Sequence, residues 1–203
     1  MLVKSAKFLI SNTDYNKCPA PDFPEYAFIG RSNVGKSSLI NALTDNSKLA
    51  KVSGKPGKTQ LINHFVINKD WYLVDLPGYG WAKVSKDAKQ SFQRLIYDYI
   101  EFRTNLQVVF VLIDIRHKPQ KIDLDFMQWL GEKGIPFTMI FTKADKLKKG
   151  ERSTLLKYYK QKMMEVWEEM PNYFVTSSAK KEGLDNVLNY IDTLNQQQEN
   201  NHN

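Results

Sequence analysis

Hydrophobic, β-branched and aromatic residues along this chain gather in short runs that alternate with longer segments of helical spacing. Six runs have the length of a β-strand and are predicted at residues 26–29, 61–67, 71–75, 106–114, 136–142 and 173–176. About five amphipathic helices are predicted around residues 39–43, 92–100, 124–130, 155–159 and 184–191. The alternation is typical of an α/β fold in which helices cover both faces of a mostly parallel sheet.

The connection between the second and third predicted strands is much shorter than the others. Asn68, Lys69 and Asp70 are typical of a tight turn, so these two strands are predicted to form an antiparallel hairpin. The six-stranded sheet would then contain one antiparallel strand.

Three segments fall outside this pattern. Residues 1–21 contain Pro19 and Pro21 among Asp and Asn residues, and are predicted to form an extended lead-in to a globular unit over residues 22–195. Residues 44–60 have no apolar period and contain Gly54, Pro56 and Gly57, which predicts a long mobile loop. Loops of that length inside a compact domain are usually functional. Residues 196–203 are too polar to bury and are predicted to form a disordered tail.

Composition narrows the class of protein. With 203 residues, 42% of them hydrophobic, the chain is expected to form one core and to be a monomer. The N-terminal apolar run is too short for a signal peptide and no stretch reaches the length of a membrane span, so a cytoplasmic location without membrane contact is expected. A net charge of +7 is compatible with a polyanionic partner such as RNA, although charge alone does not establish one.

The segment Gly30-Arg-Ser-Asn-Val-Gly-Lys-Ser37 fits the pattern GxxxxGK[ST] and lies between a predicted strand and a predicted helix. Its glycines allow backbone N–H groups to surround phosphates, and a helix N-terminus favours an anion. Lys36 is expected to reach the β- and γ-phosphates, and the Ser37 hydroxyl suits a Mg²⁺ ion that bridges them. The motif therefore predicts a nucleoside triphosphate site.

Two further motifs follow predicted strands. Asp75 and Gly78 form a DxxG pattern, whose carboxylate could hold a Mg²⁺-bound water and whose glycine N–H could contact the γ-phosphate. This pattern is weak by itself and gains value from its position. Thr142-Lys143-Ala144-Asp145 ends in a carboxylate that can accept hydrogen bonds from both N1–H and the 2-amino group of guanine, and adenine offers neither donor. In isolation it could also be a solvated turn.

Two weaker candidates complete the site. Ser177, Ser178 and Ala179 follow the last predicted strand, where a backbone N–H could contact the guanine oxygen. Thr59 in the long loop is the candidate hydroxyl that completes the Mg²⁺ shell when a γ-phosphate is present, with an ordinary loop threonine as the alternative.

The segments GRSNVGKSSLINAL, KPGKTQLINHF, DLPGYG, TKADKL and SSAK, taken together, closely resemble the bacterial EngB (YsxC) family of translation-factor-class P-loop GTPases. The resemblance spans nearly the whole chain. It implies a Ras-like G domain whose slow GTPase cycle assists late assembly of the large ribosomal subunit, with rRNA and ribosomal proteins as partners. It also implies a link to cell division and septation, and GTP or GDP with Mg²⁺ as cofactors.

The resemblance further implies which residues contact the nucleotide. By motif these are Gly30, Arg31, Ser32, Asn33, Val34, Gly35, Lys36, Ser37, Gly57, Lys58, Thr59, Gln60, Leu61, Asp75, Leu76, Pro77, Gly78, Thr142, Lys143, Ala144, Asp145, Ser177, Ser178 and Ala179. Ser37 and Thr59 would ligate Mg²⁺ directly and Asp75 through water, and the catalytic candidates are Lys36, Thr59 and Asn33.

Two departures from the broader Ras-like pattern affect the expected chemistry. Tyr79 follows Gly78, where a glutamine would orient the attacking water. We therefore expect slow intrinsic hydrolysis, stimulated by a partner or by a monovalent cation such as K⁺ near Asn33. Thr142 replaces the Asn of the NKxD pattern, which weakens one contact to the base and leaves Asp145 as the main discriminator.

Lysines are concentrated in the two segments that would sense the γ-phosphate, namely Lys48, Lys51, Lys55 and Lys58 in the first and Lys83, Lys86 and Lys89 in the second, close to Tyr79 and Trp81. Such basic and aromatic side chains could couple GTP binding to an RNA surface. A solvated surface that only promotes solubility is the alternative. Arg116, His117 and Lys118 at a strand end could extend the same face, and no catalytic role is assigned to His117.

Two rival functions share some of these features. A P-loop kinase or ATPase would have the same phosphate loop, but Asp145 and its neighbours argue against adenine. A non-hydrolysing interaction module at the division site would use the nucleotide only as a structural switch.

Overall fold

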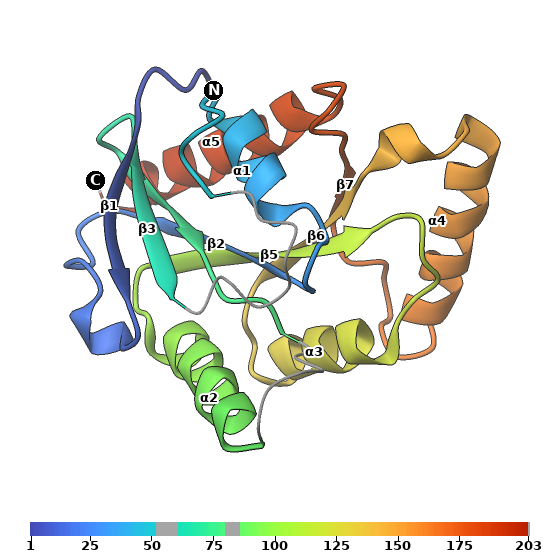
Figure 1. Cartoon of the computed structure of the whole chain (residues 1–203), viewed down its shortest axis with the longest axis horizontal. Helices are drawn as coiled ribbons and strands as arrows, with labels where there is room; N and C mark the ends of the chain where they lie inside the picture. Colours follow the sequence, from blue (N-terminus) through green and yellow to red (C-terminus); the bar gives the residue numbers. More distant parts are fainter. Residues whose placement is uncertain (52–60, 80–85, 203) are drawn as a thin grey trace.

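The computed structural model describes residues 1–51, 61–79 and 86–202. Its centre is one seven-stranded sheet with the strand order β1-β3-β4-β2-β5-β6-β7 (Figure 1). The strands are β1 (Ala6–Asn12), β2 (Glu25–Gly30), β3 (Ile62–Ile67), β4 (Trp71–Asp75), β5 (Leu106–Asp114), β6 (Phe137–Thr142) and β7 (Tyr173–Val175). β3 is antiparallel to both of its neighbours, and the other pairs are parallel. The prediction of an α/β fold with one antiparallel strand is confirmed.

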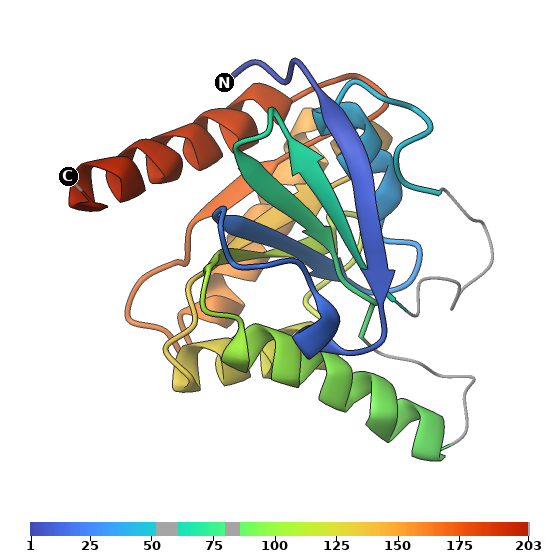
Figure 2. The same cartoon turned by 90° about the vertical axis from the view of Figure 1, so that its left-hand side faces the viewer.

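Helices cover both faces of the sheet, as predicted. They are α1 (Lys36–Leu43), α2 (Lys86–Phe102), α3 (Lys121–Glu132), α4 (Lys149–Met163) and α5 (Leu184–His202), with short 3₁₀ helices η1 (Tyr15–Lys17) and η2 (Ala144–Lys146). α1 and α5 pack on one face and α2, α3 and α4 on the other (Figures 1 and 2). Alternate residues of the central strands point to opposite faces of the sheet. Tyr26 and Phe28 therefore pack with α1 and α5, and Ala27 and Ile29 pack with α2, α3 and α4.

The number of strands is seven and not six, because the predicted lead-in contains β1. β1 is an edge strand that pairs with β3, with an irregularity in register between Phe8 and Ile10. Phe8, Leu9 and Ile10 all remain exposed, and a strand without a buried face lacks the alternation by which strands are predicted. The prediction of a disordered tail is also wrong for residues 196–202, which continue α5. These residues are polar but include no Gly or Pro that would end a helix already packed on the sheet.

The predicted hairpin between β3 and β4 is confirmed. Asn68 and Lys69 have φ angles of 53° and 62° and are the two central residues of a turn that the Asp70 N–H closes on the Ile67 carbonyl oxygen at 3.0 Å. The Asn68 side-chain oxygen also accepts hydrogen bonds from the backbone N–H of Lys4 (2.7 Å) and Ser5 (3.1 Å). The turn therefore fixes the start of β1.

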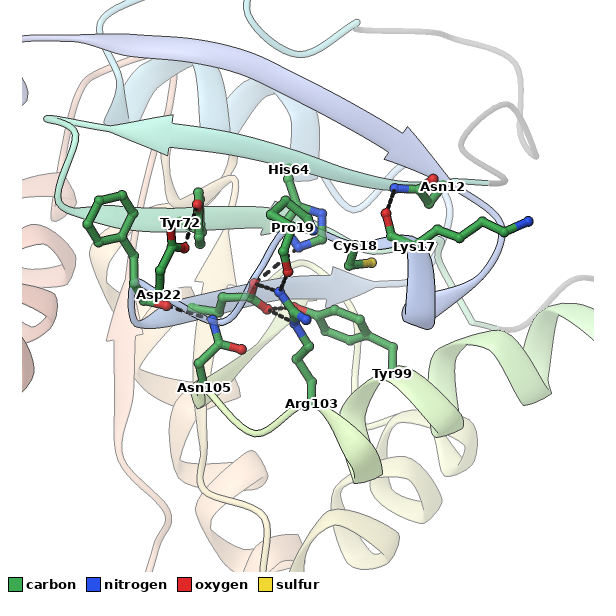
Figure 3. Close-up of polar contacts among 12 residues, drawn as sticks. Asn12, Lys17, Cys18, Pro19, Asp22, His64, Tyr72, Tyr99, Arg103 and Asn105 are labelled. Carbon is green, nitrogen blue, oxygen red and sulfur yellow. Dashed lines mark hydrogen bonds and ion pairs between the residues drawn. The ribbon is translucent and has the colours of Figure 1, made fainter.

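A buried carboxylate, that of Glu25, joins several elements at the start of β2, and its partners His64, Tyr99 and Arg103 are labelled in Figure 3. Glu25 is fully buried and accepts hydrogen bonds from the Tyr99 hydroxyl at 2.5 Å and from Arg103 Nη2 at 2.6 Å, while His64 Nε2 lies 3.3 Å away. Arg103 also donates to the carbonyl of Pro19. Burial would raise the pKa of Glu25, but the contacts with His64, Arg103 and Tyr99 lower it to about 2. Glu25 thereby ties α2 and β3 to the strand that leads into the phosphate loop.

Among the helices of the described residues, none combines the length and the hydrophobicity of a membrane span.

Candidate functional site

The phosphate loop connects the end of β2 to the start of α1, at the carboxyl edge of the sheet. Gly35 stands at the N-cap with a φ of 101°, and no side chain among the described residues caps the helix. The first N–H groups of α1 therefore keep their capacity to bind an anion. Gly30 is also required sterically, because a Cβ there would lie 2.8 Å from the carbonyl oxygen of Leu112.

The second motif lies beside this loop. β2 and β4 are parallel neighbours in a register that pairs Phe28 with Asp75, so both strands deliver their ends to the same edge. Lys36 Nζ and Asp75 Oδ1 form an ion pair whose side chains are only 10% and 5% exposed. Asn63 of β3 reaches the other oxygen of Asp75 at 3.4 Å. A lysine and a carboxylate thus meet where α1 begins, and Ser37 is the next residue of that helix.

The end of the DxxG motif packs directly on the phosphate loop. A Cβ on Gly78 would lie 2.7 Å from the carbonyl oxygen of Gly30, so only glycine fits this approach. Arg31 and Tyr79 form a parallel bridge at the same point. Leu76 and Pro77, which lie between Asp75 and Gly78, are buried. The backbone of this motif is therefore fixed against the loop.

The side chain of Tyr79 is held by α3. Its ring stacks on Phe126 with centroids 4.6 Å apart, and its hydroxyl is buried near Asp123. Burial and the Asp123 carboxyl raise the Tyr79 pKa well above its ordinary value. In this arrangement the phenol is packed into the protein and does not take the place of a water-orienting glutamine.

The third motif is bonded to the phosphate loop by two side chains. The Thr142 hydroxyl donates to the Val34 carbonyl oxygen at 2.6 Å. Lys143, which has a φ of 60°, donates to the Asn33 carbonyl oxygen at 2.5 Å and lies 3.0 Å from Asp114 Oδ2. The stem of Lys143 thereby runs beside the loop, the placement needed to cover a base plane.

Asp145 and Ser177 meet at the ends of β6 and β7. Asp145 Oδ1 accepts a hydrogen bond from the Ser177 hydroxyl at 2.6 Å, which lowers the Asp145 pKa. The Ser177 oxygen in turn accepts from the Lys180 N–H at 3.1 Å. Asp145 is therefore ionised at neutral pH and can accept two donors of guanine, and Ser178 and Ala179 follow immediately at the turn before α5.

The structure places some predicted residues outside this cluster or leaves them undescribed. Gly57, Lys58, Thr59, Gln60 and the nearby Lys55 lie outside the described residues, as do Trp81 and Lys83. Leu61 lies directly before β3 and is partly exposed. Lys86 and Lys89 belong to the start of α2, and Lys48 and Lys51 are exposed.

Sequence patterns missed Asp114, which ends β5 and organises the site. Asp114 accepts hydrogen bonds from the Arg116 guanidinium at 2.9 and 2.6 Å and pairs with Lys143. Burial opposes its ionisation, but these contacts lower its pKa to about 2. Asp75 is predicted from its DxxG pattern, which Asp114 lacks; the position of Asp114 at the end of a central strand is the signal that could have found it.

The oxygen donors at the start of α1 fit a Mg²⁺ ion. Ser37 offers a hydroxyl as a direct ligand and Asp75 a buried carboxylate that could hold a Mg²⁺-bound water, beside a loop shaped for phosphates. Of the described residues, no group of three or more His, Cys, Asp or Glu could hold a metal by itself. The donor set thus suits an ion held jointly with a phosphate.

Comparisons with known proteins agree with this geometry. A family model described as "50S ribosome-binding GTPase" matches residues 25–143. A probable GTP-binding protein EngB of Porphyromonas gingivalis is 59% identical, over 97% of this chain and 98% of that protein. Its counterpart in Flavobacterium johnsoniae is 60% identical, over 97% of this chain and 94% of that protein. The chain belongs to the EngB family of GTP-binding proteins.

Solved structures show the same fold. A crystal structure of a probable GTP-binding protein EngB has a TM-score of 0.68 and 24% identity, covering 85% of this chain and 99% of that one. Era in complex with MgGDPNP and nucleotides 1506–1542 of 16S ribosomal RNA has a TM-score of 0.65 and 22% identity, covering 83% of this chain and 55% of that one. The predicted EngB resemblance and Ras-like fold are confirmed, and EngB-family membership supports GTP or GDP as the bound nucleotide.

Proposed function

We propose that this EngB-family chain is a GTPase that hydrolyses GTP slowly with Mg²⁺ and acts as a switch in assembly of the large ribosomal subunit. Its partners would be rRNA and ribosomal proteins, and the link to division and septation would follow from this role. The G domain would span residues 22–195 together with β1 and the end of α5, and act as a cytoplasmic monomer. The observation that carries the proposal is the ionised Asp145, held by Ser177 beside a phosphate loop to which Thr142 and Lys143 are bonded.

Guanine selectivity follows from the Asp145 carboxylate. It would accept from both guanine donors, whereas adenine offers neither donor and would leave the half-buried carboxylate without these two hydrogen bonds, which can reject the wrong base by several powers of ten. Labelled GDP bound to the full chain should be displaced by unlabelled GTP and not by ATP. Asp145→Ala should weaken GDP binding by about a hundredfold while Asp192→Ala, an exposed carboxylate on α5, keeps it. Equal displacement by ATP would exclude the proposed nucleotide.

Slow hydrolysis is inferred from the machinery around the phosphates. Lys36 would neutralise charge on the β- and γ-phosphates, and Ser37, Thr59 and Asp75 would position Mg²⁺, which supplies further charge neutralisation when bound. Tyr79 is packed on α3, so the attacking water would be oriented by another group, such as a K⁺ ion near Asn33 or a ribosomal partner. Single-turnover hydrolysis should be slow in Na⁺ and rise with K⁺ or ribosomal subunits. Fast turnover without either would contradict this assignment.

The ribosomal partner is supported by charge and by the family. The chain carries a net charge of +7, and the matching family model is described as a ribosome-binding GTPase. Gradient sedimentation with separated ribosomal subunits should show association with the large subunit that differs between GDP and a non-hydrolysable GTP analogue. If the protein associates with neither subunit in either nucleotide state, the ribosome is excluded as its partner.

A non-catalytic switch at the division site remains the second candidate for the same nucleotide site. Turnover measured against a Lys36→Ala variant separates the two functions. A rate equal to that of the variant would favour the non-catalytic switch.

A further inference from the structure

One long edge of the sheet is open along β1 (Figures 1 and 2). The strand has seven residues, and β3 is its only partner among the strands of the described residues. An edge strand keeps backbone N–H and C=O groups unpaired on its outer side, which another extended chain can bind. The opposite edge is formed by β7, which has only three residues. A short edge strand is protected against such pairing by its length, and β1 lacks this protection.

The side chains of β1 make this edge apolar. Phe8, Leu9 and Ile10 follow one another and are 56%, 46% and 38% exposed. The shift in register between them pairs Phe8 with Phe65 and Ile10 with His64, whose side chains lie on opposite faces of the sheet. Apolar side chains are therefore exposed on both faces of one strand. Single apolar residues are common on surfaces, but a contiguous group on an unpaired edge marks an interaction site.

The charges beside β1 indicate the chemistry of its partner. Residues 1–21 contain three lysines and one carboxylate, that of Asp14. Lys4 and Lys7 are exposed and form no ion pair within the described residues. Asp14 already accepts hydrogen bonds from the backbone N–H and the side chain of Asn16, at 2.9 and 3.0 Å. The open edge is thus basic, and its charge is left for a partner to neutralise.

We propose that β1 binds an extended acidic segment of a partner protein, which adds to the sheet as a further strand. In this kind of recognition backbone hydrogen bonds give affinity, and alternate side chains give specificity. The segment would place apolar side chains against Phe8 and Ile10, and carboxylates beside Lys4 and Lys7. This partner goes beyond the proposed function, because none of the residues assigned to the nucleotide lies in β1.

Two other occupants fit the edge less well. RNA would meet the lysines, but it has no row of backbone N–H and C=O groups that could pair with an edge strand. A second copy of the chain would bring together two lysine-bearing edges, and each copy carries a net charge of +7. An acidic protein segment satisfies the backbone groups, the apolar side chains and the lysines together.

The test uses the full chain saturated with GDP, at one fixed salt concentration, and a fluorescent peptide of about nine residues in which Val and Ile alternate with Glu. A second peptide has Lys in place of each Glu, and a third has Pro at its central apolar position, which removes a backbone N–H and breaks the ladder. Fluorescence polarisation should show that the acidic peptide binds about tenfold more tightly than either control. Hydrogen exchange should slow in residues 6–12 when the acidic peptide is added, because their outer amides become bonded.

Matched variants locate the binding edge. Leu9→Ser and Lys7→Glu should each weaken binding of the acidic peptide by about fivefold, because the first removes an exposed apolar contact and the second reverses a charge. Val166→Ser, in the segment after α4, and Lys157→Glu, in α4, make the same changes at exposed positions and should leave binding within about twofold. Circular dichroism and GDP titration verify that every variant is folded.

The proposal can be overturned in several ways. Equal affinity for the acidic and basic peptides would exclude charge recognition, and a Pro peptide that binds as tightly as its parent would exclude strand addition. Unchanged binding by Leu9→Ser would exclude β1. Displacement of the acidic peptide by oligouridine would assign the edge to nucleic acid, and a dimer in sedimentation equilibrium that Leu9→Ser dissociates would assign it to a second copy. None of these assays uses ribosomes or GTP hydrolysis, so a failure of this edge is distinguishable from a failure of the proposed function.

Discussion

Glu25 and Asp123 are two buried carboxylates with opposite surroundings. Glu25 receives donors from His64, Arg103 and Tyr99, whereas Asp123 has one unpaired oxygen. Burial raises the pKa of Asp123 to about 6 even though Tyr79, Arg31 and His117 oppose the shift. Burial without enough donors therefore disfavours the charge, and burial with donors stabilises it.

Glu25→Gln should destabilise the fold. The amide cannot hold the charge of Arg103, and a buried cation without its partner costs about 3–5 kcal/mol. Since the Glu25 pKa is lowered to about 2, the contribution of the carboxylate is present above its unfolded pKa of 4.5 and is lost as pH falls through 2. Urea unfolding at neutral pH measures the change, and Glu168→Gln in the exposed segment after α4 is the control. Unfolding free energies that match between Glu25→Gln and wild type would show that the buried ion pair contributes no stability.

Asp123→Asn should have the opposite effect. Because the folded pKa of about 6 exceeds the ordinary 3.8, the wild type has its full stability below 3.8 and loses part of it as pH rises through 6. At mildly alkaline pH the neutral amide should therefore stabilise the fold by about 2–3 kcal/mol, and this gain should vanish in acid. Unfolding curves across this pH range test the sign, and Asp125→Asn should show no such pH dependence.

Element boundaries followed from the sequence wherever one face of a strand or helix is buried. The six predicted strands and five helices are all present because their apolar periods match their packing on the sheet. β1 was not predicted because its apolar residues remain exposed. The end of α5 was not predicted because polar residues there extend a helix that is held on the sheet by the buried Val187 and Ile191. The local pattern of apolar and polar residues encodes neither the pairing of an exposed edge strand nor the extension of a helix by polar residues.

Contact between α3 and the segment after α4 gives an element-scale prediction. Gly131 lies in α3 under Trp167, and a Cβ there would lie 2.3 Å from the indole ring. Gly131→Ala should therefore destabilise the fold by about 1–3 kcal/mol through overpacking, against a helix-propensity gain of about 1 kcal/mol. Gly150→Ala in α4 meets nothing within 4 Å and should be neutral or stabilising. Chemical denaturation measures the free energy of unfolding of both variants. Equal changes in the two would show that Trp167 moves aside without loss of stability and would contradict the overpacking.

At the scale of the molecule, the candidate site could be predicted because parallel strands bring their carboxyl ends to one edge. The motifs that follow β4 and β6 are far apart in sequence, and both meet the phosphate loop that follows β2. The cavity that this loop lines together with β5, α3 and α4 could not be predicted, since it depends on how α3 and α4 place Asp123 and Tyr159 relative to Arg31. Burial of isolated polar residues is a property of the packed fold and leaves no pattern in the chain.

Charge distribution supplies the last prediction for the whole molecule. If the lysines near Tyr79 face rRNA, replacing Lys83, Lys86 and Lys89 by Gln should weaken large-subunit binding and lower its dependence on salt, because each lost phosphate contact removes about 0.7–0.9 from the log–log slope. Replacing Lys149, Lys157 and Lys160 of α4, which are exposed, changes the net charge by the same amount on another element. Sedimentation over a range of salt concentrations should show a large change for the first set and a small one for the second. Identical slopes in the two sets would mean that net charge alone attracts the ribosome.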